Sequence, residues 1–188
     1  MRDLLDQLAQ YENFWLPVSG ENFNTLKLFR EFLRDCPSAF GRSFPGHITG
    51  SAFIVRRDSG QLLLTLHRKL NKWIQLGGHC DGETDVFEVA KKETYEESGL
   101  SNLVAYPSHD LILDLDIHEI PATPREAAHL HYDVRYLFMT DETNLRVSDE
   151  SHELRWFSME ELKHVTQERS IHRALGKIHF LSVQPPEI

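Results

Sequence analysis

Cysteine is scarce in this chain. Only Cys36 and Cys80 occur among 188 residues, and they form no CxxC pair. A disulfide framework or a zinc ribbon needs cysteines that are more numerous or more closely spaced. We therefore expect neither, and we expect a reduced, cytoplasmic setting.

Positive charge and long apolar runs are also in short supply. The chain has 20 lysine and arginine residues against 29 aspartate and glutamate residues, a formal net charge of -9. Such an acidic chain is poorly suited to broad binding of nucleic acid or of anionic membranes. Its opening residues, Met-Arg-Asp-Leu-Leu-Asp-Gln-Leu, hold no apolar run typical of a signal peptide or membrane span. We expect neither a nucleic acid polymer nor a membrane as partner.

Helical periodicity marks the first part of the chain. Apolar residues recur at helical spacing at residues 4–11 and again at 26–33, with a break at Pro17–Gly20 between them. A second, proline-containing break then leads into segments of a different pattern. We expect a helical extension at residues 1–46, packed on a main domain at residues 47–188.

Within that extension, Phe29, Phe32 and Leu33 form an apolar stripe. Such a stripe serves equally well to cover one side of a domain or to build an interface between two copies. A homodimer therefore stays open as an alternative to simple packing.

Short β-like runs follow from about residue 47. We expect strands at residues 49–56, 62–67, 73–76, 103–106, 111–117, 132–139 and 154–157. Asp58-Ser-Gly60 has the composition of a hairpin turn between the first two. Helices are predicted at residues 85–98, after Ser158, and at 171–180. The pattern predicts an α/β (α+β) sandwich with a mixed sheet.

The helix predicted at residues 85–98 is unusually acidic along one face. Asp85 suits its N-cap, and Gly99 suits its end. Glu93, Glu96 and Glu97 are spaced i, i+3 and i+4, so they project from one side. Clustered carboxylates repel one another, and a divalent cation such as Mg²⁺ or Mn²⁺ removes that penalty. A solvated acidic face is the simpler alternative.

The segment Gly78–Leu100, called the box below, resembles the Nudix motif GX5EX7REUXEEXGU, in which U is aliphatic. Six residues match the motif in register: Gly78, Glu93, Glu96, Glu97, Gly99 and Leu100. Lys92 replaces the motif arginine, and Thr94 replaces an aliphatic residue. Thr84 replaces a glutamate, although Glu83 lies one residue earlier. The resemblance implies a Nudix-type α/β/α sandwich from about residue 47.

The resemblance also implies an activity. Nudix enzymes typically use Mg²⁺ or Mn²⁺ to hydrolyse the pyrophosphate bond of a nucleoside diphosphate linked to another moiety. Glu93 and Glu97 would be the main metal ligands, with Glu96 a further ligand or a residue that positions water. Family members often take another carboxylate from a loop before the closing strand, and Glu150 is our candidate for a ligand or general base. An exposed acidic turn is an equal alternative for Glu150.

Other residues are candidates for binding the substrate diphosphate. Gly78 and His79 stand in the glycine loop, and Glu83 would serve if the loop is shifted by one residue. Arg68 precedes the loop and carries a phosphate-binding side chain. An ordinary solvated turn is the alternative for Arg68.

Eleven histidines is a high number for 188 residues. His129 and His131 would share one face of a strand, and His118 lies on the run before it. These three suggest either a second metal or phosphate site, or hydrogen-bonded strand histidines. We favour the second reading because no CxxC or HExxH pattern accompanies them.

Three functions remain in competition. A metal-dependent hydrolase leads, because Glu93, Glu96 and Glu97 are intact. A catalytically weak nucleotide-binding or sensor protein gains support from the changes at Thr84 and Lys92. Isomerisation of isopentenyl diphosphate on the same fold would need an active-site cysteine, for which Cys80 is the candidate, although burial is the commoner fate of a lone cysteine.

Overall fold

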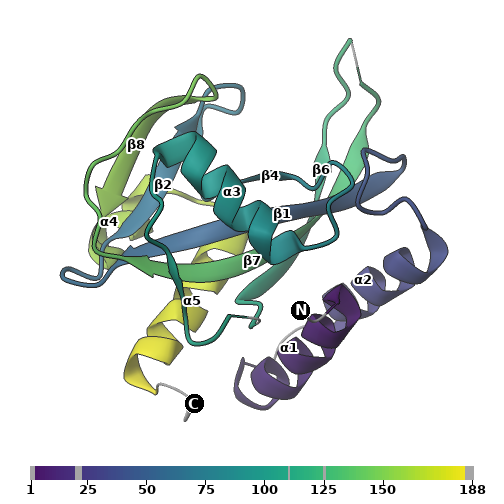
Figure 1. Cartoon of the computed structure of the whole chain (residues 1–188), viewed down its shortest axis with the longest axis horizontal. Helices are drawn as coiled ribbons and strands as arrows, with labels where there is room; N and C mark the ends of the chain where they lie inside the picture. Colours follow the sequence, from purple (N-terminus) through teal and green to yellow (C-terminus); the bar gives the residue numbers. More distant parts are fainter. Residues whose placement is uncertain (1–2, 20–22, 110, 125, 185–188) are drawn as a thin grey trace.

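The structure, a computed structural model, describes residues 3–19, 23–109, 111–124 and 126–184. A mixed sheet of eight strands lies between helices (Figure 1). The elements are α1 Leu4–Ser19, α2 Phe23–Asp35, β1 Gly46–Arg56, β2 Leu62–His67, β3 Lys72–Ile74, β4 Leu76–His79, α3 Val86–Ser98, β5 Val104–Ala105, β6 Asp114–Ile120, β7 His129–Thr140, β8 Ser151–Phe157, α4 Met159–Val165 and α5 Arg169–Val183. The expected fold class is confirmed.

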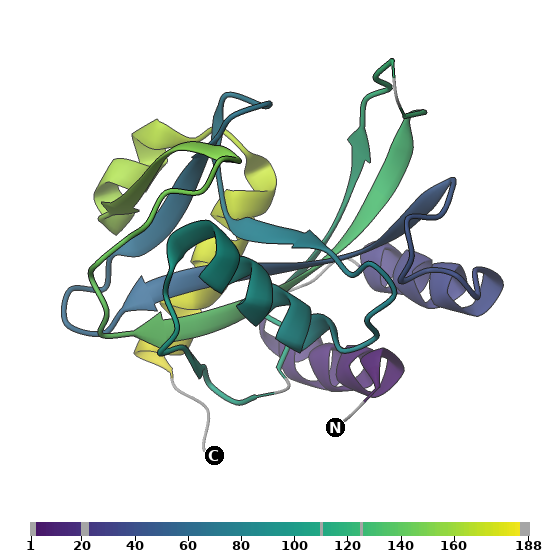
Figure 2. The same ribbon diagram turned by 45° about the horizontal axis from the view of Figure 1, so that its top comes forward.

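Strand β1 organises the sheet. It runs parallel to β7 along its whole length, whereas its middle pairs antiparallel with β4 and its end pairs antiparallel with β2. Strands β3 and β8 extend the sheet beyond β2, and β5 and β6 pair with β7. The split between β2 and β4 lets the sheet curl, as Figure 2 shows.

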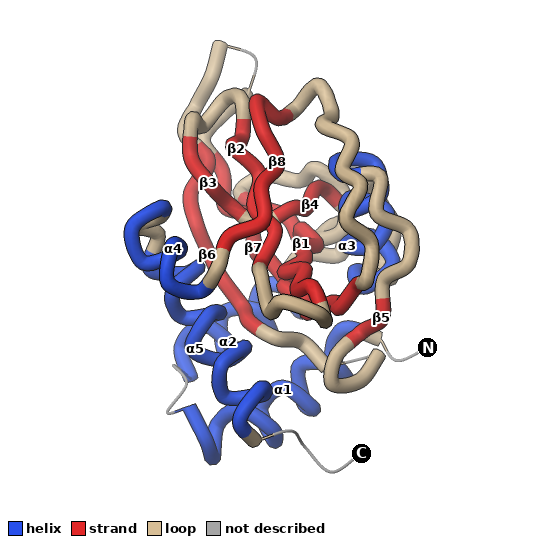
Figure 3. The backbone as a smooth tube through the Cα atoms, turned by 90° about the vertical axis from the view of Figure 1, so that its left-hand side faces the viewer, coloured by secondary structure: helices blue, strands red, loops and turns tan. Residues whose placement is uncertain are grey.

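The two faces of the sheet differ in chemistry. Gly50 of β1 faces α3, because a Cβ there would lie 2.8 Å from the backbone of Val86. Alternation along β1 therefore turns Thr49 and Ser51 to the opposite face. Helix α5 covers part of that face by pairing with the acids of β6. Figure 3 shows α3 on one side of the strands and α4 and α5 on the other.

The N-terminal helices pack on the same hydrophobic core as the sheet. The ring of Phe32 stacks on Tyr132 of β7 at 4.0 Å, and Phe29 meets the same ring edge-on. Phe29 is fully buried, so this stripe covers the domain. The break predicted at Pro17–Gly20 is confirmed, because α1 ends at Ser19 and α2 begins at Phe23, although Pro17 itself lies inside α1. Pro17 lies in the last turn, where few hydrogen bonds are lost; Gly20 lies outside the described residues.

Two strand predictions also need correction. The single run expected at residues 73–76 is two short strands, β3 and β4, which pair with different neighbours on either side of Gln75. The run expected from Leu111 becomes a strand only at Asp114. Residues 111–113 are buried outside the strand, and the indole N–H of Trp15 donates to the carbonyl of Ile112 at 2.9 Å.

No described helix is both long and apolar enough to cross a membrane.

Candidate active site

Helix α3 begins and ends where its sequence predicts. The Asp85 side chain accepts the backbone N–H of Glu88, and Gly99 ends the helix at a φ of 78°. Thr94 stands at an aliphatic position of the box, but its hydroxyl donates to the carbonyl of Ala90 at 2.8 Å. That bond satisfies the buried polar group. The change to threonine therefore leaves the helix intact.

Two glutamates of α3 lie against the glycine pair of β4. A Cβ on Gly78 would stand 2.5 Å from the carboxyl carbon of Glu93, a contact that only glycine permits. The backbone N–H of Gly77 donates to the Glu97 carboxylate at 3.1 Å. Glu96 is exposed and lies 3.6 Å from the Lys92 ammonium. Strand pairing and helix spacing thus bring the three box glutamates to one side of α3.

The carboxylates of Glu93 and Glu97 bind protons more tightly than usual. Burial raises the pKa of Glu97 to about 8, and the N–H of Gly77 only partly opposes this. Burial and the charge of Glu96 also raise the pKa of Glu93. Glu97 is 5% exposed and forms no ion pair with a described cationic side chain. Among the described groups, the Gly77 N–H offsets its charge only in part, which is why burial still raises its pKa.

Glu150, from the turn before β8, belongs to the same electrostatic neighbourhood. Its charge contributes to the raised pKa of both Glu93 and Glu97. Arg68 holds this turn: its backbone N–H donates to the carbonyl of Glu150 at 2.9 Å, and its guanidinium donates to the carbonyl of Ser151 at 3.1 Å. Arg68 therefore positions the turn that carries Glu150.

The loop between β4 and α3 uses Glu83 locally. Its carboxylate accepts the backbone N–H groups of Thr84 and Asp85 at 2.8 and 3.0 Å. Arg42 reaches the same loop and pairs with Asp81 at 2.7 Å. In this arrangement Glu83 shapes the loop and points its carboxylate at backbone.

The α3 cluster fits a hard divalent cation. Its donors are carboxylate oxygens, which Mg²⁺ and Mn²⁺ prefer over nitrogen or sulfur. A bound cation would favour the ionised form of buried Glu97, whose pKa burial raises to about 8, and would relieve the mutual repulsion of Glu93, Glu96 and Glu150. Glycine at position 78 keeps the space beside Glu93 clear. The residues present therefore suit the metal that the box implies.

Histidines gather on the other face of the sheet. The predicted pair is confirmed, since Nε2 of His129 lies 3.3 Å from Nε2 of His131. Sequence reasoning missed His47, whose ring lies 4.8 Å from that of His131 and 5.0 Å from that of His79. Burial lowers the pKa of His79 to about 4 and of His131 to about 2, so both rings are neutral at pH 7. Nothing in the local sequence near His47 signals this proximity.

A buried charged network separates the histidines from α5. Arg135, 2% exposed, donates to Asp133 at 2.7 Å and lies 3.4 Å from Asp114. The network contains three acids and three bases: Asp114, Asp116, Asp133, Arg135, Arg173 and Lys177. Since its charges balance, Arg135 is a structural residue and not one open to substrate.

Cys80 does not have the properties of an acid–base group. Its side chain is 4% exposed and belongs to the hydrophobic core. Burial raises the pKa of its thiol to about 12. Reactive cysteines instead have a lowered pKa and solvent access. The geometry thus disfavours the isomerase alternative.

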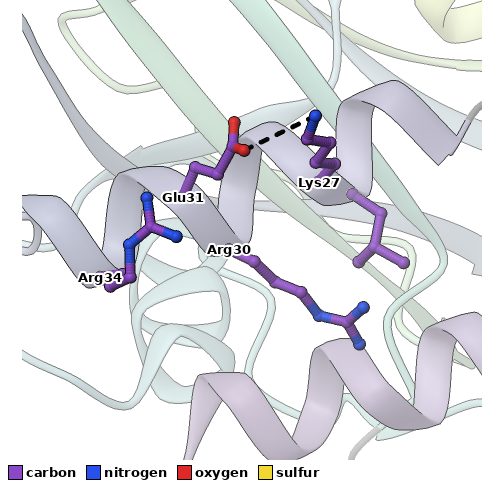
Figure 4. A pocket seen from close by; sticks show the side chains of 5 residues that line it. Lys27, Arg30, Glu31 and Arg34 are labelled. Carbon is purple, nitrogen blue, oxygen red and sulfur yellow. Dashed lines mark ion pairs between the residues drawn. The ribbon is translucent and has the colours of Figure 1, made fainter.

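A surface hollow on α2 offers no anion site. It is lined by Leu26, Lys27, Arg30, Glu31 and Arg34 (Figure 4). Each basic residue there pairs with an acid: Lys27 with Glu31 at 3.7 Å, Arg30 with Glu12 at 2.7 Å and Arg34 with Asp35 at 2.7 Å. These pairs leave little positive charge for a phosphate.

Comparisons with known proteins agree with this geometry. The family model described as NUDIX domain matches residues 46–175. A hydrolase of the NUDIX family from Clostridium perfringens is 30% identical, with 72% of this chain and 97% of that chain covered and a TM-score of 0.54. No match was found among curated proteins.

Two further solved structures share the fold at lower identity. A C. elegans Ap4A hydrolase is 17% identical, with 73% of this chain and 98% of that chain covered and a TM-score of 0.59. A MutT protein from Methanosarcina mazei Go1 is 19% identical, with 74% and 97% covered and a TM-score of 0.56. The chain therefore belongs to the Nudix hydrolase family, whose members cleave phosphoanhydride bonds of nucleoside diphosphate derivatives.

Proposed function

We propose that this enzyme uses Mg²⁺ or Mn²⁺ to hydrolyse the pyrophosphate bond of a nucleoside diphosphate linked to another moiety. The observation that carries the proposal is the buried carboxylate of Glu97, which a backbone N–H approaches but no described cationic side chain does. Ionisation of a buried carboxylate without a cationic partner costs free energy, and a cation bound beside Glu97 would remove that cost.

Each carboxylate has a distinct proposed role. Glu93 and Glu97 hold the cation, and Glu96, on the exposed side of α3, is a further ligand or positions water. The bound cation supplies charge neutralisation for the pyrophosphate oxygens and a lowered pKa for water. Glu150 is the candidate ligand or general base, since its charge contributes to the raised pKa of both Glu93 and Glu97.

The loop residues have proposed roles in substrate binding. Because Gly78 has no side chain, the Glu93 carboxylate lies directly against the backbone of β4, and we expect the substrate diphosphate to meet the bound cation beside this carboxylate. Glu83 lies in the loop that follows β4, and Arg68 anchors the turn that carries Glu150. The side chain of His79 turns to the opposite sheet face, toward His47 and His131, so His79 is not among the residues that we propose to bind phosphate. For Arg68 and Glu83 the contacts described above support shaping of the site more directly than contact with phosphate.

Substitution of Glu97 tests the metal site. Glu97→Gln removes the charge but keeps the shape, so activity should fall at least about 100-fold without loss of folding. Glu160→Gln, an exposed glutamate on α4, is the control and should leave activity unchanged. Release of phosphate or nucleotide is measured with Mg²⁺ and with Mn²⁺. Full activity of Glu97→Gln, or of wild type in excess chelator, would contradict the proposed metal-dependent mechanism.

A substrate screen then separates hydrolysis from binding alone. Nucleoside triphosphates, nucleotide sugars, dinucleotides and ADP-ribose are the compounds to compare, because specificity in one fold comes from loops outside the box. The use of Glu83 as a local cap, with Thr84 in place of glutamate, favours a weak or binding-only protein as the alternative. Tight nucleotide binding without any turnover would support that alternative.

A further inference from the structure

Five imidazole rings gather on the sheet face that points away from α3. Neighbouring rings have centroids 4.8–5.4 Å apart. They come from four strands: His47 from β1, His79 from β4, His118 from β6, and His129 and His131 from β7. Strand pairing aligns them, since His131 stands opposite both His47 and His118. The cluster is therefore fixed by the register of the sheet.

Three of these rings converge on one point. The nearest ring nitrogens of His47, His79 and His131 all lie within 4.8 Å of one another. We propose that these three histidines bind a divalent transition-metal ion of the zinc class, at a site separate from the α3 carboxylates. Zinc–imidazole bonds are about 2.0–2.1 Å long, so the rings would rotate inward to bring three nitrogens to a common ion.

His47 is prepared as a ligand. Its Nδ1 lies 3.3 Å from the carbonyl of Ser43 and donates to it, because a carbonyl only accepts. The lone pair is then on Nε2, which is buried and has no hydrogen-bond partner among the described residues. His47 is only 2% exposed, so water cannot readily satisfy this atom. An unmet buried acceptor costs about 1–3 kcal/mol, which a bound ion removes.

The surroundings of the three ligands suit a cation. His129 has its Nδ1 2.9 Å from the carbonyl of Ala127, which leaves the Nε2 lone pair facing His131 at 3.3 Å. Two ligand nitrogens of a tetrahedral zinc site are about 3.4 Å apart, so His129 is placed to complete it. Glu126 lies 3.8 Å from His129 and adds negative charge. Arg42, the nearby cation, is paired with Asp81.

The two proposed metal sites differ in donor chemistry. The α3 site offers only carboxylate oxygens, whereas the histidine site offers imidazole nitrogens. Imidazole favours zinc, copper, nickel and iron, and Mg²⁺ binds it poorly. The two sites therefore select different ions, and excess Mg²⁺ should not displace the ion held by the histidines.

The histidine site sits directly behind the catalytic glycine loop. Gly78 faces Glu93, and the next residue, His79, points to the opposite face and joins His47 and His131. An ion bound there ties β4 to β1 and β7, and so fixes the backbone beneath Glu93.

Binding of Co²⁺ and Zn²⁺ to the full chain tests the site. Metal-free protein is titrated with Co²⁺ in excess Mg²⁺, which occupies the carboxylates. One equivalent should give the visible bands of a tetrahedral nitrogen-rich site, and Zn²⁺ should raise the melting temperature. His131→Ala should weaken binding at least about 100-fold and lose the rise in melting temperature. His179→Ala, an exposed histidine on α5, should behave as wild type.

X-ray absorption at the zinc edge of wild-type protein gives a second measurement that does not depend on a variant folding. Outer-shell scattering from imidazole rings is the expected result, and it should persist in Glu97→Gln. A spectrum with oxygen ligands only, or Co²⁺ binding that is equal in wild type and His131→Ala, overturns the proposal. Hydrolysis in Mg²⁺ is measured separately, so failure here leaves the proposed function untouched.

Discussion

The side chain of Glu93 occupies the space that a Cβ on Gly78 would need. The carboxyl carbon lies 2.5 Å from that position, and one carboxylate oxygen is equally close. No larger residue at position 78 is compatible with this placement of Glu93. Two distant parts of the box are thus coupled sterically, which explains why a glycine and a glutamate stand there together.

Gly78→Ala should therefore impair catalysis more than stability. The clashing atoms are the end of a flexible side chain, so Glu93 can rotate away while the strand stays in place. A displacement of about 1 Å can cost 100-fold in rate, and a loss of that order is expected. Turnover and urea unfolding are measured together.

Gly176→Ala is the matched control for that substitution. A Cβ at Gly176 meets nothing within 4 Å, and the residue lies inside α5. Stability should rise by about 0.5–1 kcal/mol, with activity unchanged. If Gly78→Ala keeps wild-type turnover, the close placement of Glu93 is not needed for catalysis.

Glu150→Gln should lower kcat if this carboxylate assists the reaction. Its charge contributes to the raised pKa of Glu93 and Glu97, and the backbone N–H of Arg68 donates a hydrogen bond to its carbonyl. Loss of a general base typically costs about 100-fold or more. Asp149→Asn, in the same turn, should change kcat little. Equal rates for Glu150→Gln and wild type would show that Glu150 is only part of an exposed acidic turn and takes no part in the reaction.

Cys80→Ala should leave hydrolysis intact. The thiol is buried and its pKa is raised to about 12, so it is neither nucleophile nor acid at neutral pH. Removal of a buried side chain should cost about 1–2 kcal/mol in unfolding free energy. Wild-type protein should also resist thiol reagents while folded. Loss of turnover in folded Cys80→Ala would revive a chemical role for the cysteine.

Local signals explain why much of the fold was predictable. Asp85 and Gly99 bound α3 as expected, and the helix predicted after Ser158 begins with a capping box formed by Ser158 and Glu161. Such signals act over a few residues and need no tertiary contact. The split at Gln75 was missed because the strands on its two sides pair with different partners, which only the assembled sheet determines.

The same distinction applies to the sites. Glu93, Glu96 and Glu97 share one helix, so their spacing alone predicts that they cluster. His47 and His79 approach His131 only through the pairing of β1 with β4 and β7. A pairing between strands that other elements separate along the chain leaves no local pattern, and His47 was therefore not predicted.

The buried network around Asp116 makes the free energy of unfolding depend on pH. Burial by itself would raise the pKa of Asp116, but the hydrogen bond with His118 and the charges of Arg135 and Arg173 outweigh it and hold the pKa below its ordinary value. The unfolded chain then binds a proton more readily than the folded chain. The stabilisation is present above the ordinary carboxyl pKa and is lost as pH falls through the lower, folded value.

Asp116→Asn should accordingly destabilise the protein at neutral pH and much less in acid. At pH 7 the loss should be about 2–4 kcal/mol, because Arg135 and Arg173 keep their burial but lose a charged partner. The difference from wild type in urea unfolding should shrink below about pH 4, where the unfolded carboxyl becomes protonated. Asp141→Asn, in an exposed loop, should show no such pH dependence. A difference that stays constant from pH 7 to acid would mean that Asp116 stabilises the fold through shape and not through its charge.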